Sequence, residues 1–99
     1  MTVPWDIPDQ RRPEYEALVE LLMAHAAPGD TDARRVAEWV SHSALGDDHL
    51  YRDMGFADRA EVRALLEAHF PDLAAGNTKD MRWKKYFYKR LCGWPGFET

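Results

Sequence analysis

The chain has 99 residues, which is the size of one small domain. Hydrophobic residues make up 45% of it and charged residues 30%, a balance that excludes a disordered chain and is typical of a globular protein. The net charge of −4 is unevenly distributed, because residues 79–90 contain six basic residues and one acid while the remainder is strongly acidic. This asymmetry predicts an electrostatic contact, either within the fold or with a charged partner.

The sequence gives no indication of a membrane or secretory destination. No apolar run approaches the roughly 18 to 20 residues that a membrane helix needs. The N-terminus, "MTVPWDIPDQRRPEYE", lacks the basic start and apolar stretch of a secretory signal. Cys92 is the only cysteine in the sequence and cannot form an intramolecular disulfide, which fits a reducing compartment. We therefore expect a cytoplasmic protein with no membrane contact.

The first half of the chain is predicted to be helical after a short arm. Residues 1–12 are expected to form an extended arm, and residues 13–99 the helical domain. Pro13 suits the first turn of a helix, where its missing N–H is not needed. The helix that follows has an apolar face at helical spacing and ends at "PGD", residues 28–30. The residues of this face are Tyr15, Leu18, Val19, Leu22 and Ala26.

A second helix is predicted over "DARRVAEWVSHSAL", residues 32–45, with Asp30 or Thr31 as its cap and Gly46 as its end. Its apolar stripe is rich in alanine, which would let another helix approach closely. The stripe consists of Ala33, Val36, Ala37, Val40 and Ala44. The next stretch, "GDDHLYRDMGF" at residues 46–56, is predicted to be a loop or a single short helix.

Two further helices are predicted in the second half. Asp58 and Glu61 form a reciprocal capping pattern at the start of the third, and Pro71 is expected to end it. "DLAAGN" then turns the chain into a last helix from about Asp80 to Cys92, followed by a glycine. No segment alternates with period two. The sequence thus predicts an all-α fold, a small bundle of about four helices with an extended N-terminal arm, and no sheet.

The last predicted helix combines an apolar stripe with many cations. Trp83, Phe87 and Leu91 recur at helical spacing, which is typical of a core-facing stripe. The basic residues that surround the stripe favour pairing with an acidic partner, an oxyanion or the protein's own acidic helices; they are Arg82, Lys84, Lys85, Lys89 and Arg90. Interleaved basic and aromatic residues also occur in nucleic-acid-binding proteins, but a pI of about 5.5 opposes that interpretation.

Metal and catalytic motifs are weak. The histidines lie in separate segments without the spacing that would place two metal ligands on one helical face, and they are best interpreted as surface or helix-end residues; they are His25, His42, His49 and His69. Ser41 and Ser43 flank one of them, yet sequence neighbours say nothing about a triad in space. No phosphate loop or nucleophile elbow occurs. We expect neither an enzyme nor a metal site.

Three strings in order resemble the NifQ family: "DHLYRDMGF", "AHFP" and "NTKDMRWKKYFYKRLC". The similarity is specific over residues 46–92 and looser over residues 14–45. It implies a role in nitrogen fixation, because NifQ proteins are linked to molybdenum delivery for the iron–molybdenum cofactor of nitrogenase. Family members are thought to carry molybdenum on an iron–sulfur cluster held by four cysteines in a C-x4-C-x2-C-x5-C arrangement after the basic helix.

This chain departs from that pattern. After Cys92, which corresponds to the family cysteine before the cluster motif, it reads "GWPGFET". Iron–sulfur clusters are typically held by four thiolates, so we expect no cluster on this chain. We interpret it as a short form without the cluster, and a truncated remnant whose partner supplies the missing parts stays open.

The resemblance and the charge pattern lead to one expected function and two alternatives. We expect a non-catalytic accessory or interaction module that binds nitrogenase, its metallocofactor assembly machinery or a related metalloenzyme. The alternatives are a molybdate or metal carrier that uses the cationic helix and the histidines, and a nucleic-acid-binding regulator. The residues predicted to bind the partner or an anion are Asn77, Asp80, Arg82, Trp83, Lys84, Lys85, Tyr88, Lys89 and Arg90.

Overall fold

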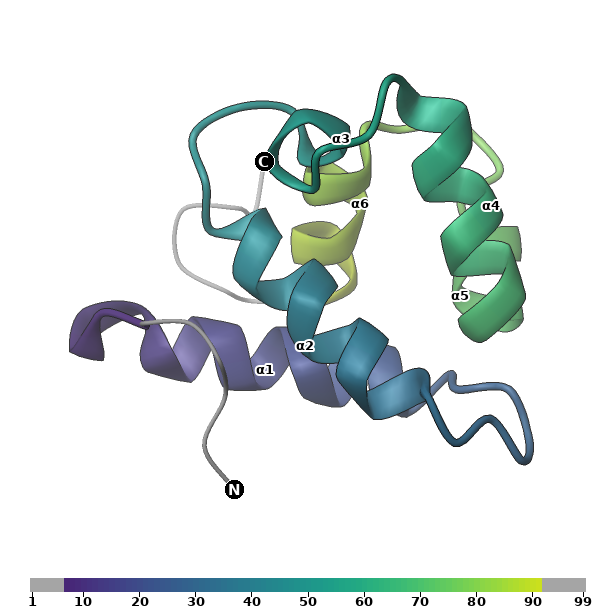
Figure 1. Ribbon diagram of the computed structural model, residues 1–99, viewed down its shortest axis with the longest axis horizontal. Helices are drawn as coiled ribbons and strands as arrows, with labels where there is room; N and C mark the ends of the chain where they lie inside the picture. Colours follow the sequence, from purple (N-terminus) through teal and green to yellow (C-terminus); the bar gives the residue numbers. More distant parts are fainter. Residues whose placement is uncertain (1–6, 92–99) are drawn as a thin grey trace.

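The computed structural model describes residues 7–91, and their secondary structure is entirely helical (Figure 1). The helices follow one another as the short 3-10 helix η1 (Asp9–Arg11), α1 (Arg12–Met23), α2 (Ala33–Ala44), α3 (Leu50–Asp53), α4 (Arg59–His69), α5 (Pro71–Ala75) and α6 (Trp83–Arg90). The all-α prediction is confirmed, including the four longer helices. None of the helices in residues 7–91 is long and apolar enough to cross a membrane.

The helices pack around one core. In Figure 1, α1 and α2 lie side by side, α4 and α5 form the right-hand side, and α6 lies between these two groups. The alanine-rich face of α2 is buried, as predicted, and lets the neighbouring α1 approach closely. Phe87 of α6 and Phe70 between α4 and α5 are among the largest fully buried side chains, so α6 is a structural centre of the fold.

Short helices refine the sequence predictions at three places. Residues 9–11, expected to belong to the extended arm, form η1, and residues 1–6 of the arm lie outside the described residues. The chain leaves α4 just before Pro71, as predicted: Phe70 adopts φ −136° and ψ 62°, and Pro71 then occupies the first turn of α5. The segment 46–56 contains the short helix α3, one of the two possibilities left open.

The last helix begins later than predicted. Asp80 has φ 51°, a left-handed conformation that cannot continue a helix, so α6 starts at Trp83 instead of Asp80. Its predicted end at Cys92 lies outside the described residues. The cap of α4 by Asp58 is confirmed, since its carboxylate accepts the Glu61 N–H at 3.2 Å; the return bond is shifted by one residue, because the Glu61 carboxylate accepts the N–H of Ala57, at 2.7 Å, instead of that of Asp58.

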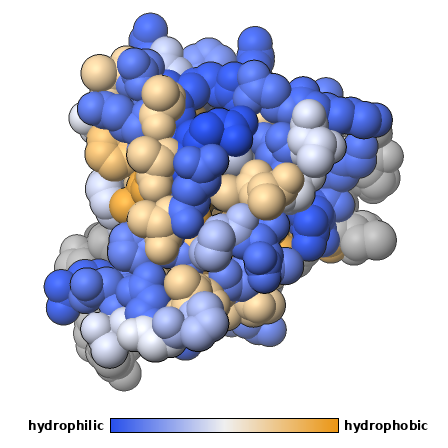
Figure 2. Space-filling view, turned by 90° about the vertical axis from the view of Figure 1, so that its right-hand side faces the viewer, coloured by the Kyte–Doolittle hydropathy of each residue, from blue (hydrophilic) through white to orange (hydrophobic). Residues whose placement is uncertain are grey.

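The surface over α4 is mostly hydrophilic. Figure 2 shows the side of the molecule that lies to the right in Figure 1, where small apolar patches interrupt a largely hydrophilic surface. Ala60, Ala64 and Ala68 recur at helical spacing on α4 and are exposed. Because alanine presents little apolar area, this face resembles an ordinary solvated helix surface.

Candidate functional site: a groove beside α6

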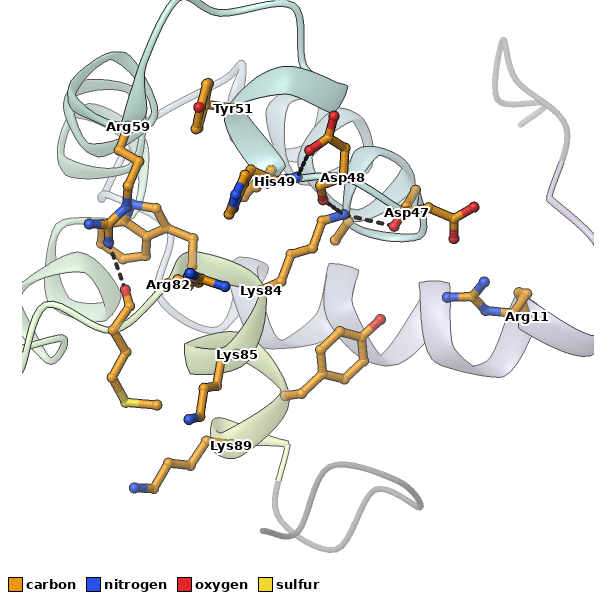
Figure 3. A pocket seen from close by; sticks show the side chains of 16 residues that line it. Arg11, Asp47, Asp48, His49, Tyr51, Arg59, Arg82, Lys84, Lys85 and Lys89 are labelled. Carbon is orange, nitrogen blue, oxygen red and sulfur yellow. Dashed lines mark hydrogen bonds between the residues drawn. The ribbon is translucent and has the colours of Figure 1, made fainter.

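A groove of about 680 Å³ lies between the segment 46–51 and α6. We call it the α6 groove. Figure 3 shows its two walls, with His49 and Tyr51 on one side and the α6 residues on the other. The groove is partly open to solvent. Its lining residues are Arg11, Ala44, Gly46, Asp47, Asp48, His49, Leu50, Tyr51, Arg59, Met81, Arg82, Trp83, Lys84, Lys85, Tyr88 and Lys89.

Lys84 joins the two walls. Its ammonium donates to the carbonyl of Gly46 at 2.7 Å, to the carbonyl of Asp48, and to the Asp53 carboxylate at 2.7 Å. Only 20% of the Lys84 side chain is exposed. All three of its donors are thus used within the fold. Lys84, predicted as a binding residue, instead positions the loop at residues 46–48 against α6.

Gly46 leaves room for the Asp53 carboxylate in this arrangement. A Cβ atom there would lie 2.5 Å from the Asp53 Oδ2 atom, which is closer than real Cβ atoms approach another atom. Any larger residue would therefore push the Asp53 carboxylate away from Lys84. The close approach of the loop to α3 explains why a residue without a side chain, Gly46, follows α2.

Asn77 and Asp80, also predicted as binding residues, form the turn that leads into α6. The Asn77 side chain is buried, accepts the Met81 N–H at 2.8 Å and donates to the Met81 carbonyl at 2.9 Å. Asp80 pairs with Arg59 at 3.3 Å and with Arg63 at 3.0 Å. Hydrogen bonds from these two guanidinium groups lower the pKa of Asp80 below its ordinary value. Both residues thus stabilise the turn before α6, and their binding role stays a prediction.

Trp83 and Tyr88 are buried rather than presented to a partner. Trp83 is 3% exposed, and the Arg63 guanidinium lies 5.2 Å from its ring centroid. The Tyr88 hydroxyl donates to the Glu14 carboxylate, which in turn accepts two hydrogen bonds from Arg11, at 2.8 and 3.0 Å. This buried network fastens α6 to the start of α1. The structure places both rings largely in the core, although they also contribute to the lining of the groove, and their binding role stays a prediction.

Arg90 also has a role within the fold. It donates to the Tyr86 hydroxyl at 3.2 Å and approaches the His25 ring at 3.4 Å, while Tyr86 donates to the Leu73 carbonyl at 2.7 Å. Arg90 is not among the residues that line the α6 groove. Arg90 lies on the side of α6 that faces α5 and the end of α1.

Arg82, Lys85 and Lys89 are the predicted binding residues that stay exposed in the α6 groove. Lys85 and Lys89 are four residues apart and share one face of α6, and Arg82 is the residue immediately before the helix. Figure 3 shows the three side chains on the α6 side of the groove. Of the nine predicted residues, the structure thus gathers three into an accessible cationic stripe.

The opposite wall was not among the predicted binding residues. Tyr51 and His49 are stacked with ring centroids 5.7 Å apart and an interplanar angle of 9°. Asp48 pairs with Arg52 at 3.7 Å and accepts the His49 N–H at 2.7 Å. The irregular pattern of residues 46–56 was a signal for this loop, but nothing in the sequence placed it against α6. Such proximity depends on the tertiary contacts of Lys84.

The described residues do not fit an iron–sulfur cluster. Residues 7–91 contain no cysteine, and within them no three His, Asp or Glu side chains gather in a way that could hold a metal ion. Thiolates are the ligands that such clusters need. The chemistry that the described site offers is instead recognition of negative charge.

The model of the NifQ family matches residues 3–99. The chain belongs to the NifQ family. It is 51% identical over 85 residues to the "Protein NifQ homolog" of Sinorhizobium fredii (strain NBRC 101917 / NGR234), a match that covers 86% of this chain and 37% of that protein. It is 44% identical over 91 residues to "Protein NifQ" of Azotobacter vinelandii, with 92% and 47% covered. No solved structure matches the chain significantly.

The NifQ match spans nearly all of this chain but only part of its relatives. "Protein NifQ" of Klebsiella pneumoniae is 43% identical over 61 residues, which cover 62% of this chain and 36% of that protein. The chain thus spans less than half the length of these curated relatives. The predicted family is confirmed, and its name places the members among nitrogen-fixation proteins.

Proposed function

We propose that this NifQ-family chain is a non-catalytic interaction module that binds nitrogenase or the machinery that assembles its metallocofactor. The observation that carries the proposal is the exposed cationic stripe of Arg82, Lys85 and Lys89 beside an open groove. The NifQ resemblance supports the setting, namely molybdenum processing for nitrogen fixation. The other predicted residues are buried, are engaged in contacts within the fold or lie outside the groove, which supports this stripe as the binding surface.

The groove favours binding over catalysis. None of the described residues that line it is a serine, threonine or cysteine. The His49 ring stacks on Tyr51, and the Lys84 ammonium is occupied by three oxygen atoms. Acid–base and nucleophilic catalysis need a base within hydrogen-bond reach of the group that it activates. The groove instead offers three exposed cations, one just before α6 and two on the helix.

A molybdate or metal carrier is the second candidate, because the exposed cations attract oxyanions. The groove volume of about 680 Å³ favours a larger occupant, since a pocket of this size accommodates drug-sized ligands. A nucleic-acid-binding regulator is the weakest candidate, because the net charge of −4 repels a long polyanion.

Affinity purification from a nitrogen-fixing host tests the proposal. The tagged chain should recover a nitrogenase component or a cofactor-assembly protein, identified by mass spectrometry, in nitrogen-fixing cells and not in ammonium-grown cells. Deletion of the gene should lower nitrogenase activity most when molybdate is scarce. Recovery of the chain alone, together with unchanged nitrogenase activity at every molybdate level, would refute the proposal.

A further inference from the structure

We propose that the α6 groove binds an acidic, extended segment of a partner protein, whose carboxylates pair with Arg82, Lys85 and Lys89. This inference rests on the proposed function in one respect, that the chain binds a protein. It adds the chemistry of the partner surface and the place where it docks.

The cationic stripe lacks the intrahelical pairing that other surface cations have. Arg34 pairs with Glu38 at 3.5 Å and Arg63 pairs with Glu67 at 3.8 Å, each four residues further along its helix. Lys85 and Lys89 are also four apart, but they carry the same charge, and like charges at this spacing destabilise a helix. A carboxylate from outside the chain would remove this repulsion.

Other cations that line the groove are already neutralised. Arg11 pairs with Glu14, Arg59 pairs with Asp80, and Lys84 pairs with Asp53. For Arg82, Lys85 and Lys89, no ion pair is found among residues 7–91. An external acidic group would therefore be attracted most strongly to the stripe.

The opposite wall suits an extended peptide. Lys84 fixes the loop at residues 46–48, and Tyr51 stacks on His49, so this wall is formed before any partner arrives. A preformed site loses little conformational entropy on binding. The tyrosine ring offers apolar area to the side chains that alternate with the acidic ones along an extended segment.

The two ends of the groove differ in charge, and this difference determines the orientation of the segment. Asp47 is exposed and lies toward Arg11, while Lys85 and Lys89 lie farther along α6 (Figure 3). Asp47 would repel an acidic residue at its end. The acidic part of the segment therefore lies over Lys85 and Lys89, and the end near Asp47 is neutral or basic.

Multiple contacts distinguish a peptide from a single small anion. Exposed ion pairs are individually weak, so a single oxyanion would bind these exposed side chains with little favourable free energy. A segment with several carboxylates engages the three cations together and excludes water from the wall formed by Tyr51. We therefore favour the acidic segment, with a free oxyanion and nucleic acid as outcomes of the test.

The experiment is an NMR titration of the 15N-labelled chain with a glutamate-rich peptide, beside a glutamine-rich peptide of the same length. The glutamate-rich peptide should shift the amide signals of residues 48–51 and 82–89, and its affinity should fall steeply with salt. The glutamine-rich peptide should leave them unchanged. Fluorescence anisotropy should show a loss of affinity of about tenfold or more in K85E/K89E.

Two further variants control for charge and folding. R35E/K79E makes the same change in net charge at exposed positions outside the groove, and its affinity should stay within about twofold of the parent. K85Q/K89Q removes the cations without reversing them, and its affinity should lie between those of the parent and K85E/K89E. Circular dichroism melting curves show whether each variant is folded.

Several results would overturn the inference. These are unchanged groove signals, equal loss of affinity in R35E/K79E, or equal binding of the glutamine-rich peptide. The site would be assigned to molybdate or to nucleic acid if sodium molybdate alone, or duplex DNA, shifted the groove signals and displaced the peptide. Peptide binding in the groove without any nitrogenase association in cells would refute the proposed function alone, so the two failures are distinguishable.

Discussion

Two neighbouring lysines have different roles in this fold although they are the same residue type. Lys84 and Lys85 have the same chemistry and adjoin in the sequence, but one is held by three oxygen atoms and the other is exposed. A rotation of 100° per residue along a helix places them on different faces. The pattern "WKKYFYK" predicts that some lysines are exposed, but it does not predict which of them contacts the loop at residues 46–48.

The variant K84M should therefore destabilise the protein while K85M should not. K84M leaves the carbonyls of Gly46 and Asp48 and the Asp53 carboxylate without their donor, at a cost of about 1–2 kcal/mol in the free energy of unfolding. K85M should change it by less than about 0.5 kcal/mol, as exposed substitutions usually do. Urea denaturation measures both. Equal effects of the two changes would contradict the role assigned to Lys84.

At the scale of elements, the start of α6 depends on the turn before it. Asn77 forms two hydrogen bonds with the backbone of Met81, and Asp80 adopts a left-handed conformation. This turn directs Trp83 into the core and Arg82 into the groove. The cap of α4 could be predicted because its partners are three residues apart. The turn before α6 could not, because "NTKD" fits several loop geometries.

The variant N77A should loosen this turn. Removal of the buried amide leaves the Met81 N–H without an acceptor, so we expect a loss of about 1–3 kcal/mol in the free energy of unfolding. T78A alters the next, exposed residue and serves as the control. Hydrogen exchange should show faster exchange of the Met81 amide in N77A than in T78A. Unchanged exchange at this amide would show that the side chain does not determine the turn.

At the scale of the whole molecule, ion pairs join segments that are distant in the sequence. The His69 Nδ1 atom lies 2.6 Å from the Asp30 Oδ2 atom and connects the end of α4 to the segment before α2. Asp80 likewise connects the turn before α6 to Arg59 and Arg63 of α4. The hydrogen bond from His69 lowers the pKa of Asp30, as the two arginines lower that of Asp80.

These shifts predict a loss of stability in acid. A carboxyl group whose pKa is lower in the folded state stabilises the protein fully above its ordinary pKa of 3.8, and this contribution disappears as pH falls through the lower, folded value. The variant D30N/D80N should be less stable at neutral pH and should lose less stability below pH 3.8 than the parent. Thermal melts across this range measure the difference.

A charge-matched control separates these two carboxylates from the others. E16Q/D72N removes two exposed carboxylates for which the described residues show no ion pair. It should follow the parent profile more closely than D30N/D80N does. Parallel acid profiles of the parent and D30N/D80N would show that these contacts do not contribute to stability.

The sequence by itself determined the fold class, the four longer helices, the NifQ family and the presence of a basic, aromatic last helix. These features depend on local periodicity, capping and residue order, which a linear chain displays directly. Only the tertiary structure decided which residues of that helix remain accessible. Asp80, Trp83, Lys84 and Tyr88 are engaged by atoms from distant segments and Asn77 by the nearby backbone of Met81, whereas Arg82, Lys85 and Lys89 are not engaged in this way. Burial and ion pairing depend on packing in three dimensions, so no spacing along the chain could distinguish the two sets.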